Sequence, residues 1–116
     1  MNMGAKYLRV NATTREGRFA LTAAVRDAIS EAGAWITDFR QFSNVSVCVS
    51  FELESQQVAR LSQALQRLNL SLPPESLQSL EETGRAAPGA AVMGSLQITF
   101  VRNEPDVLTP PPAVPG

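Results

Sequence analysis

An α+β fold is predicted for this chain of 116 residues, with two helices lying on one face of a four-stranded antiparallel sheet. Two patterns carry this prediction. Three short segments alternate apolar and polar residues with a period of two, a fourth is rich in β-branched and aromatic residues, and both features are typical of strands. Two longer segments repeat apolar residues at helical spacing. Their order along the chain is strand, helix, strand, strand, helix, strand. This βαββαβ order is that of the ferredoxin-like arrangement.

The first strand and the first helix are expected in the opening third of the chain. Residues 6–14 alternate, and their apolar face consists of Leu8, Val10 and Ala12. From about Phe19 the apolar period becomes helical, with a stripe formed by Leu21, Val25, Ala28, Ile29 and Ala32. Gly33 follows at the position where a left-handed residue commonly ends a helix. In the polar loop before the helix, Gly17 permits a turn with positive φ.

An antiparallel hairpin is predicted next, from strands at residues 34–42 and 45–55 that are joined by a short turn. The inward set of its second strand consists of Val45, Val47, Val49, Phe51 and Leu53. The outward set consists of Ser46, Cys48, Ser50, Glu52 and Glu54. This clean alternation indicates that one face is buried while the other can meet water or a partner.

The second helix is predicted over about residues 55–69, with Ser55 as its N-cap. Residues 71–82 are expected to add a short helical turn, because Pro74-Glu75 suits the first turn of a helix. Residues 83–94 are rich in small residues and are predicted to form a mobile loop. The last strand then follows, with an inward face of Leu96, Ile98 and Phe100.

One domain, residues 1–103, fits the length of the chain and its apolar content of 44%. Residues 104–116 are predicted to be a proline-rich, extended tail, since prolines cannot continue a strand. Such a tail is either simply flexible or a recognition segment.

Composition argues against several classes of function. The 10 basic and 11 acidic residues give a net charge of −1, whereas proteins that bind nucleic acids or membrane surfaces usually have a basic excess. The outward residues of the third strand also lack the aromatic rings on which RNA bases stack. With no histidine and a single cysteine, neither a metal site nor a histidine-dependent catalytic group is expected. We therefore expect no enzymatic activity and no cofactor.

The single cysteine, Cys48, cannot form an internal disulfide, which suits a reducing compartment. No cation neighbours it in sequence, so an unreactive thiol is expected. The N-terminus has no apolar signal region, and no run is long enough to span a bilayer. A cytoplasmic protein without a membrane partner is therefore predicted.

Residues 7–70 resemble an ACT domain, most closely the ACT modules attached to phosphoserine phosphatases and glycine-cleavage regulators. The first loop of that family commonly has the sequence D-R-P-G, and here T-R-E-G at residues 14–17 occupies the same place. The family's first helix ends in a pattern like A-E-A-G-x-N-I, and here residues 30–36 have the sequence S-E-A-G-A-W-I. The chain differs from the family at Thr14, Glu16 and Trp35.

The resemblance implies a small regulatory module that is homodimeric and binds an amino acid or a similar anionic metabolite beside this loop, at a subunit interface. The N-terminus of a helix presents unpaired N–H groups that stabilise a carboxylate. Arg15 and Arg18 would pair with the carboxylate, and Glu16 with an amino group. The candidate ligand-binding residues are Asn11, Thr13, Thr14, Arg15, Glu16, Gly17, Arg18, Ala34, Trp35 and Ile36.

Purely structural interpretations of the same residues remain open. Thr13 or Thr14 could only cap the helix, Gly17 could only form the turn, and Trp35 could only pack. A second function of a different class is a ligand-free module for dimerisation or protein binding, which would use its sheet face and proline-rich tail.

Overall fold

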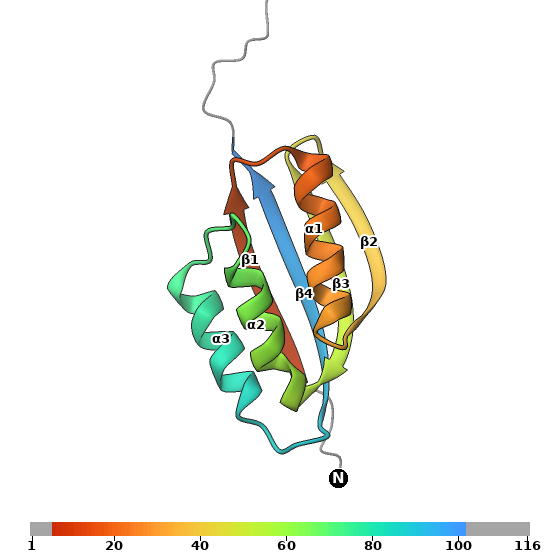
Figure 1. Ribbon diagram of the computed structural model, residues 1–116, viewed down its shortest axis with the longest axis vertical. Coiled ribbons are helices and arrows are strands. Elements are labelled where there is room, and N and C mark those ends of the chain that lie inside the picture. Colours follow the sequence, from red (N-terminus) through yellow and green to blue (C-terminus); the bar gives the residue numbers. More distant parts are fainter. Residues whose placement is uncertain (1–5, 102–116) are drawn as a thin grey trace, which may run out of the picture.

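The computed structural model describes residues 6–101 as an α+β domain (Figure 1). The class predicted from the sequence is therefore confirmed. Along the chain the elements are β1 (Lys6–Thr14), α1 (Arg18–Glu31), β2 (Trp35–Ser43), β3 (Ser46–Glu54), the 3₁₀ turn η1 (Ser55–Gln57), α2 (Val58–Gln66), α3 (Pro74–Gly84) and β4 (Ala91–Phe100). The predicted tail, residues 104–116, lies outside the described residues.

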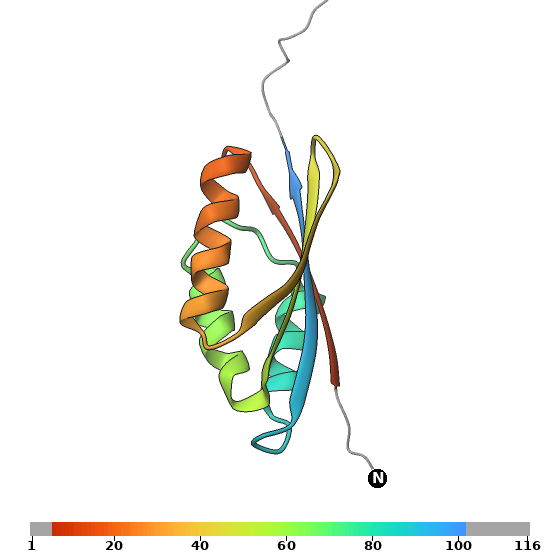
Figure 2. The same ribbon diagram turned by 90° about the vertical axis from the view of Figure 1, so that its right-hand side faces the viewer.

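The four strands form one mixed sheet in the order β1-β4-β3-β2. β3 runs antiparallel to both β2 and β4, whereas β1 and β4 are parallel. The prediction of a purely antiparallel sheet is therefore wrong, and the ferredoxin-like order is not confirmed. Helices α1 and α2 cover one face of the sheet, and α3 lies beside β1 (Figures 1 and 2).

The third helix, α3, explains why the sheet is mixed. The short turn predicted within residues 71–82 is a helix of 11 residues that begins at Pro74. Helices α2 and α3 run in opposite directions as a helical hairpin (Figure 1). A crossover through one helix would return the chain parallel to β3, whereas two helices bring β4 back antiparallel to it. β4 can therefore pair directly with β3 and lies between β3 and β1.

The end of α1 follows the prediction, but its start does not. Gly33 has a φ of 91°, its N–H donates to the carbonyl of Ser30 at 3.0 Å, and the N–H of Ala34 donates to Ile29 at 3.1 Å. These two bonds define a Schellman motif. Gly17, in contrast, has a φ of −65° and a ψ of 144°. This is ordinary extended backbone, so a positive-φ turn is not found there.

The second predicted helix begins with η1, and Ser55 is not its N-cap. Glu54 takes that position, where its N–H donates to Oε1 of Gln57 at 3.0 Å as part of a capping box. The Ser55 side chain is buried and its Oγ donates to the carbonyl of Ala87 at 2.6 Å. Ser55 therefore fastens η1 to the segment before β4.

The core lies between the sheet and helices α1 and α2, and α3 adds Leu80 to it. The predicted inward sets of β1, β3 and β4 are buried, except that Val45 in the hairpin turn is half exposed. β4 begins at Ala91, so residues 91–94 of the predicted loop belong to the strand and residues 85–90 make the connection. No helix within residues 6–101 is long and apolar enough to cross a membrane.

The two edges of the sheet differ. On the β1 edge, the N–H of Asn11 donates to Oγ of Ser76 in α3 at 2.9 Å. Thr13 and Ser71 exchange two backbone hydrogen bonds of 3.0 and 2.8 Å. Hydrogen bonds to Ser71 and Ser76 therefore satisfy part of this edge. β2 forms the other edge, and no strand of residues 6–101 pairs with its outer side.

Replacing Gly94 with alanine tests the pairing of β4 with β3. Gly94 lies opposite Phe51, and an added Cβ would overlap the Phe51 ring. We expect Gly94→Ala to lower the free energy of unfolding by about 1–3 kcal/mol, because the packed ring must shift. Urea denaturation measures this change. The control is Gly17→Ala, where no atom lies within 4 Å of an added Cβ, and it should cost about 0.5 kcal/mol. Equal losses in the two variants would contradict the pairing.

Candidate functional site

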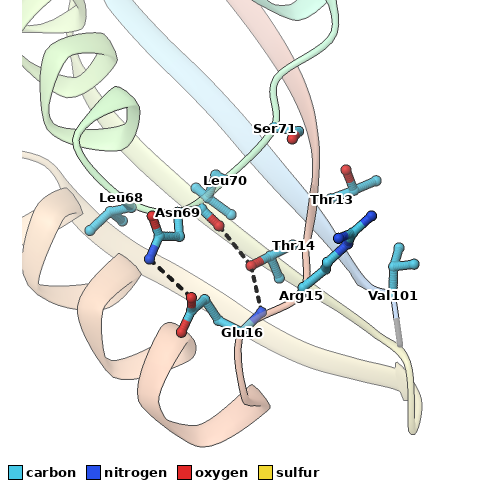
Figure 3. A pocket seen from close by; sticks show the side chains of 9 residues that line it. All are labelled: Thr13, Thr14, Arg15, Glu16, Leu68, Asn69, Leu70, Ser71 and Val101. Atoms are coloured by element: carbon cyan, nitrogen blue, oxygen red, sulfur yellow. Dashed lines mark hydrogen bonds between the residues drawn. The ribbon is translucent and has the colours of Figure 1, made fainter. Parts of the chain in front are cut away.

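An open pocket of about 530 Å³ lies beside the loop that the sequence analysis singled out (Figure 3). One wall is formed by Thr13–Glu16, at the end of β1. The other wall is formed by Leu68–Ser71, in the connection between α2 and α3, and Val101 lies at the margin. Residues 68–71 were not among the predicted site residues, because their closeness to the loop depends on the path of α3.

Buried Thr14 connects the two walls of this pocket through hydrogen bonds. Its hydroxyl is buried, donates to the carbonyl of Asn69 at 2.7 Å and accepts the N–H of Glu16 at 3.0 Å. Its own carbonyl accepts the N–H of Val101 at 2.7 Å. Thr14 therefore links both walls of the pocket and is occupied by structural bonds. It does not cap α1.

Glu16 is also engaged within the chain. Its Oε2 accepts a hydrogen bond of 2.9 Å from the side-chain amide of Asn69 (Figure 3). A ligand amino group would have to share this carboxylate with Asn69, or approach its other oxygen. The prediction that Glu16 receives an amino group is thus compatible with the geometry but is not directly supported by it.

Arg15 is the charged group in the pocket that stays available. Its side chain is exposed, and within residues 6–101 it takes part in neither a hydrogen bond nor an ion pair. The hydroxyls of Thr13 and Ser71 line the same pocket and likewise have no bonded partner in this part of the chain. One guanidinium and two hydroxyls can together bind a small anion.

The start of α1 does not contribute to this pocket. Gly17 is the N-cap, and no side chain of the described residues caps the first turn. Arg18 points to the other side of the loop, where its Nη1 donates to the carbonyl of Asn44 at 3.0 Å. The structure therefore separates the helix N-terminus and Arg18 from the pocket at Thr13–Glu16.

The remaining predicted site residues lie apart from the loop. Ala34, Trp35 and Ile36 follow the far end of α1 (Figure 1), a helix of 14 residues and therefore about 21 Å long. Ala34 is buried and Ile36 packs against the core, whereas Trp35 is 57% exposed. Asn11 lies along β1 and bonds to α3. Within one chain these residues do not form a joint site with the loop.

The face of the sheet that lacks helices is a second candidate surface (Figure 2). Strand register places its outward side chains in rows across the sheet. The first row consists of Tyr7, Met93, Glu52 and Trp35. The second row consists of Arg9, Ser95, Ser50 and Asp38, and the third of Asn11, Gln97, Cys48 and Arg40. Large exposed side chains thus gather at one end, and small ones occupy the centre.

Cys48 lies near the centre of this face without the environment of a nucleophile. Burial, and then the negative charge of Asp38, raise the pKa of the Cys48 thiol, and Arg40 opposes them more weakly. The thiol is therefore protonated at neutral pH. Asp38 and Arg40 form an exposed ion pair of 2.9 Å beside it. Among residues 6–101, no three metal-ligating side chains gather at one place.

No protein-family model, curated protein or solved structure matches the chain. The resemblance to ACT domains therefore stays a hypothesis. What the chain does has to be inferred from the geometry of the pocket, of the sheet face and of the exposed strand edge.

Proposed function

We propose that this domain is an interaction module that pairs with a second copy of itself through the helix-free face of the sheet. The observation that carries this proposal is the row at one end of the face, where Tyr7 is 78% and Trp35 57% exposed, with Met93 and Glu52 between them. Aromatic side chains and methionine are enriched in interfaces between proteins. An exposed aromatic row on a small domain indicates such a surface.

The charges of the second row favour a second copy as the partner. Arg9 lies on β1 and Asp38 on β2, at opposite edges of the same row. A two-fold axis parallel to the strands would place β1 of one copy over β2 of the other. Arg9 would then face Asp38 of the second copy, and by symmetry the reverse pair would form as well. The second row is thus complementary to itself in charge.

The same axis also determines which side chains meet in the first row and at the centre of the second row. Tyr7 would face Trp35 of the second copy, and the small residues Ser50 and Ser95 would meet near the centre. Small side chains there let two sheets approach to the usual separation of about 10 Å. Burial of the aromatic rings would supply most of the favourable free energy, and the ion pairs would select the orientation.

Charge reversal tests this arrangement. Arg9→Asp or Asp38→Arg alone should weaken the dimer at least about tenfold, because like charges then face each other twice. The double variant Arg9→Asp/Asp38→Arg should recover much of the loss, since the pairs are restored in reverse. Loss of the exposed Asp38–Arg40 pair within the chain costs little. Sedimentation equilibrium measures the dissociation constants.

The matched control is Arg60→Asp, an exposed position on α2, which should leave the dimer unchanged. A wild-type protein that remains monomeric at hundreds of micromolar would contradict the proposal. A double variant as weak as the two single variants would contradict the two-fold orientation that pairs Arg9 with Asp38.

A second candidate function is the binding of an amino acid or a similar anion in the pocket beside Thr13–Glu16, as the resemblance to ACT modules implies. The observation that favours it is that the Arg15 guanidinium forms neither a hydrogen bond nor an ion pair within residues 6–101. Calorimetry with the twenty amino acids should then show binding below millimolar that Arg15→Gln weakens about tenfold. Arg85→Gln, on the exposed end of α3, serves as the control. Binding that is absent, or unaffected by Arg15→Gln, would contradict this candidate.

A further inference from the structure

A groove of about 310 Å³ lies between α1 and the β2–β3 hairpin, on the helix-bearing side of the sheet. α1 and the hairpin diverge toward the end where α1 begins (Figure 2). The lining is contributed from α1 by Arg18, Phe19, Thr22, Ala23 and Arg26, and from the hairpin by Phe39, Gln41 and Val47. The groove has no part in the surfaces described above.

Two arginines give this groove a positive charge. The guanidinium of Arg18 lies 5.3 Å from the ring centroid of Phe19, and that of Arg26 lies 5.1 Å from that of Phe39. Stacking on the rings holds the guanidinium groups against the groove. Neither arginine forms an ion pair within residues 6–101, and no carboxylate lines the groove. Arg18 keeps part of its guanidinium free, because only its Nη1 donates, to the carbonyl of Asn44. A molecule that binds in this groove is therefore expected to carry negative charge.

Thr22 lines the groove between the arginines, and its hydroxyl oxygen is buried beneath the surface of the groove. Oγ1 of Thr22 is buried and has no hydrogen-bond partner among the described residues. Such a group lowers stability and requires an explanation. Thr22 lies four positions after Arg18 and four before Arg26, so all three share one side of α1. The Cα atoms of the two arginines are therefore about 12 Å apart.

The edge of β2 borders this groove and is free to pair. Irregularities in the β2–β3 register between Ile36 and Asp38, and between Gln41 and Ser43, enclose a regular stretch at residues 38–41. Because β2 is at the edge of the sheet, alternate residues of this stretch point their N–H and C=O groups away from β3. An extended chain can hydrogen-bond there.

We propose that the groove binds an extended peptide with two carboxylates four residues apart, which adds as a strand to β2 at residues 38–41. In a strand, side chains i, i+2 and i+4 share a face, and i and i+4 are about 13 Å apart. This spacing matches that of Arg18 and Arg26. The side chain at i+2 lies between the Phe19 and Phe39 rings above Thr22. An aromatic side chain, such as that of tyrosine, suits the two neighbouring rings.

Synthetic peptides test the proposal on the full chain. An acetylated, amidated peptide of sequence A-E-T-Y-T-E-A should bind, and calorimetry should show at least about tenfold weaker binding for A-Q-T-Y-T-Q-A, which lacks the charge-assisted bonds. The peptide A-E-T-Y-E-T-A should be weakened similarly, since its second carboxylate points to the other face. Binding should shift the backbone amide resonances of residues 38–41.

Matched variants locate the site. Arg26→Gln should weaken the first peptide about tenfold and leave dimerisation unchanged, whereas Arg60→Gln, on exposed α2, should have no effect on either. Equal binding of the acidic and neutral peptides would overturn the proposal. So would an unchanged affinity in Arg26→Gln, or no binding at millimolar peptide. Sedimentation is measured in parallel, so this proposal can fail while the dimer persists, or the reverse.

Discussion

The position of β4 between β1 and β3 is the constraint on which the rest of the structure depends. β4 pairs along its length with β1 on one side and with β3 on the other, so it is hydrogen-bonded on both edges. Its inward residues are buried, and its Gly94 leaves room for the Phe51 ring. The α2–α3 hairpin determines the direction in which β4 enters the sheet.

Three properties of the molecule follow from this position. β1 becomes an edge strand, and α3 with the segment before it lies against that edge through Asn11 and Thr13. The connection from α2 to α3 then meets the loop after β1 and encloses the pocket there. β2 remains the other edge, whose outer side pairs with no strand in the described part of the chain. The pocket, the sheet face and the groove along β2 are thus consequences of one pairing.

Local features were predictable because they depend on neighbours in sequence. The alternation in β3 predicted its buried face, and Gly33 predicted the end of α1, since each pattern acts within a few residues. The role of Ser55 was mistaken because a hydroxyl before a helix can bond elsewhere, and here the carbonyl of Ala87 accepts it. The length of α3 was underestimated. For that reason the predicted direction of β4 was wrong.

The candidate sites were predictable only in part, for a related reason. Thr13–Glu16 do line a pocket, yet its second wall at residues 68–71 is distant in sequence. The placement of Arg9 and Asp38 in one row of the sheet depends on strand register, which alternation alone does not determine. Trp35 was singled out correctly as unusual, but its exposure relates it to the sheet face rather than to the loop.

Nuclear Overhauser effects between strand backbones test the position of β4 most directly. In uniformly labelled protein, Leu96 should show contacts both to Val10 in β1 and to Val49 in β3, since paired strands lie about 4.8 Å apart. Contacts between the backbones of Val10 and Val49, with none between Leu96 and Val49, would place β1 beside β3. That result would contradict the order β1-β4-β3-β2 and the surfaces derived from it.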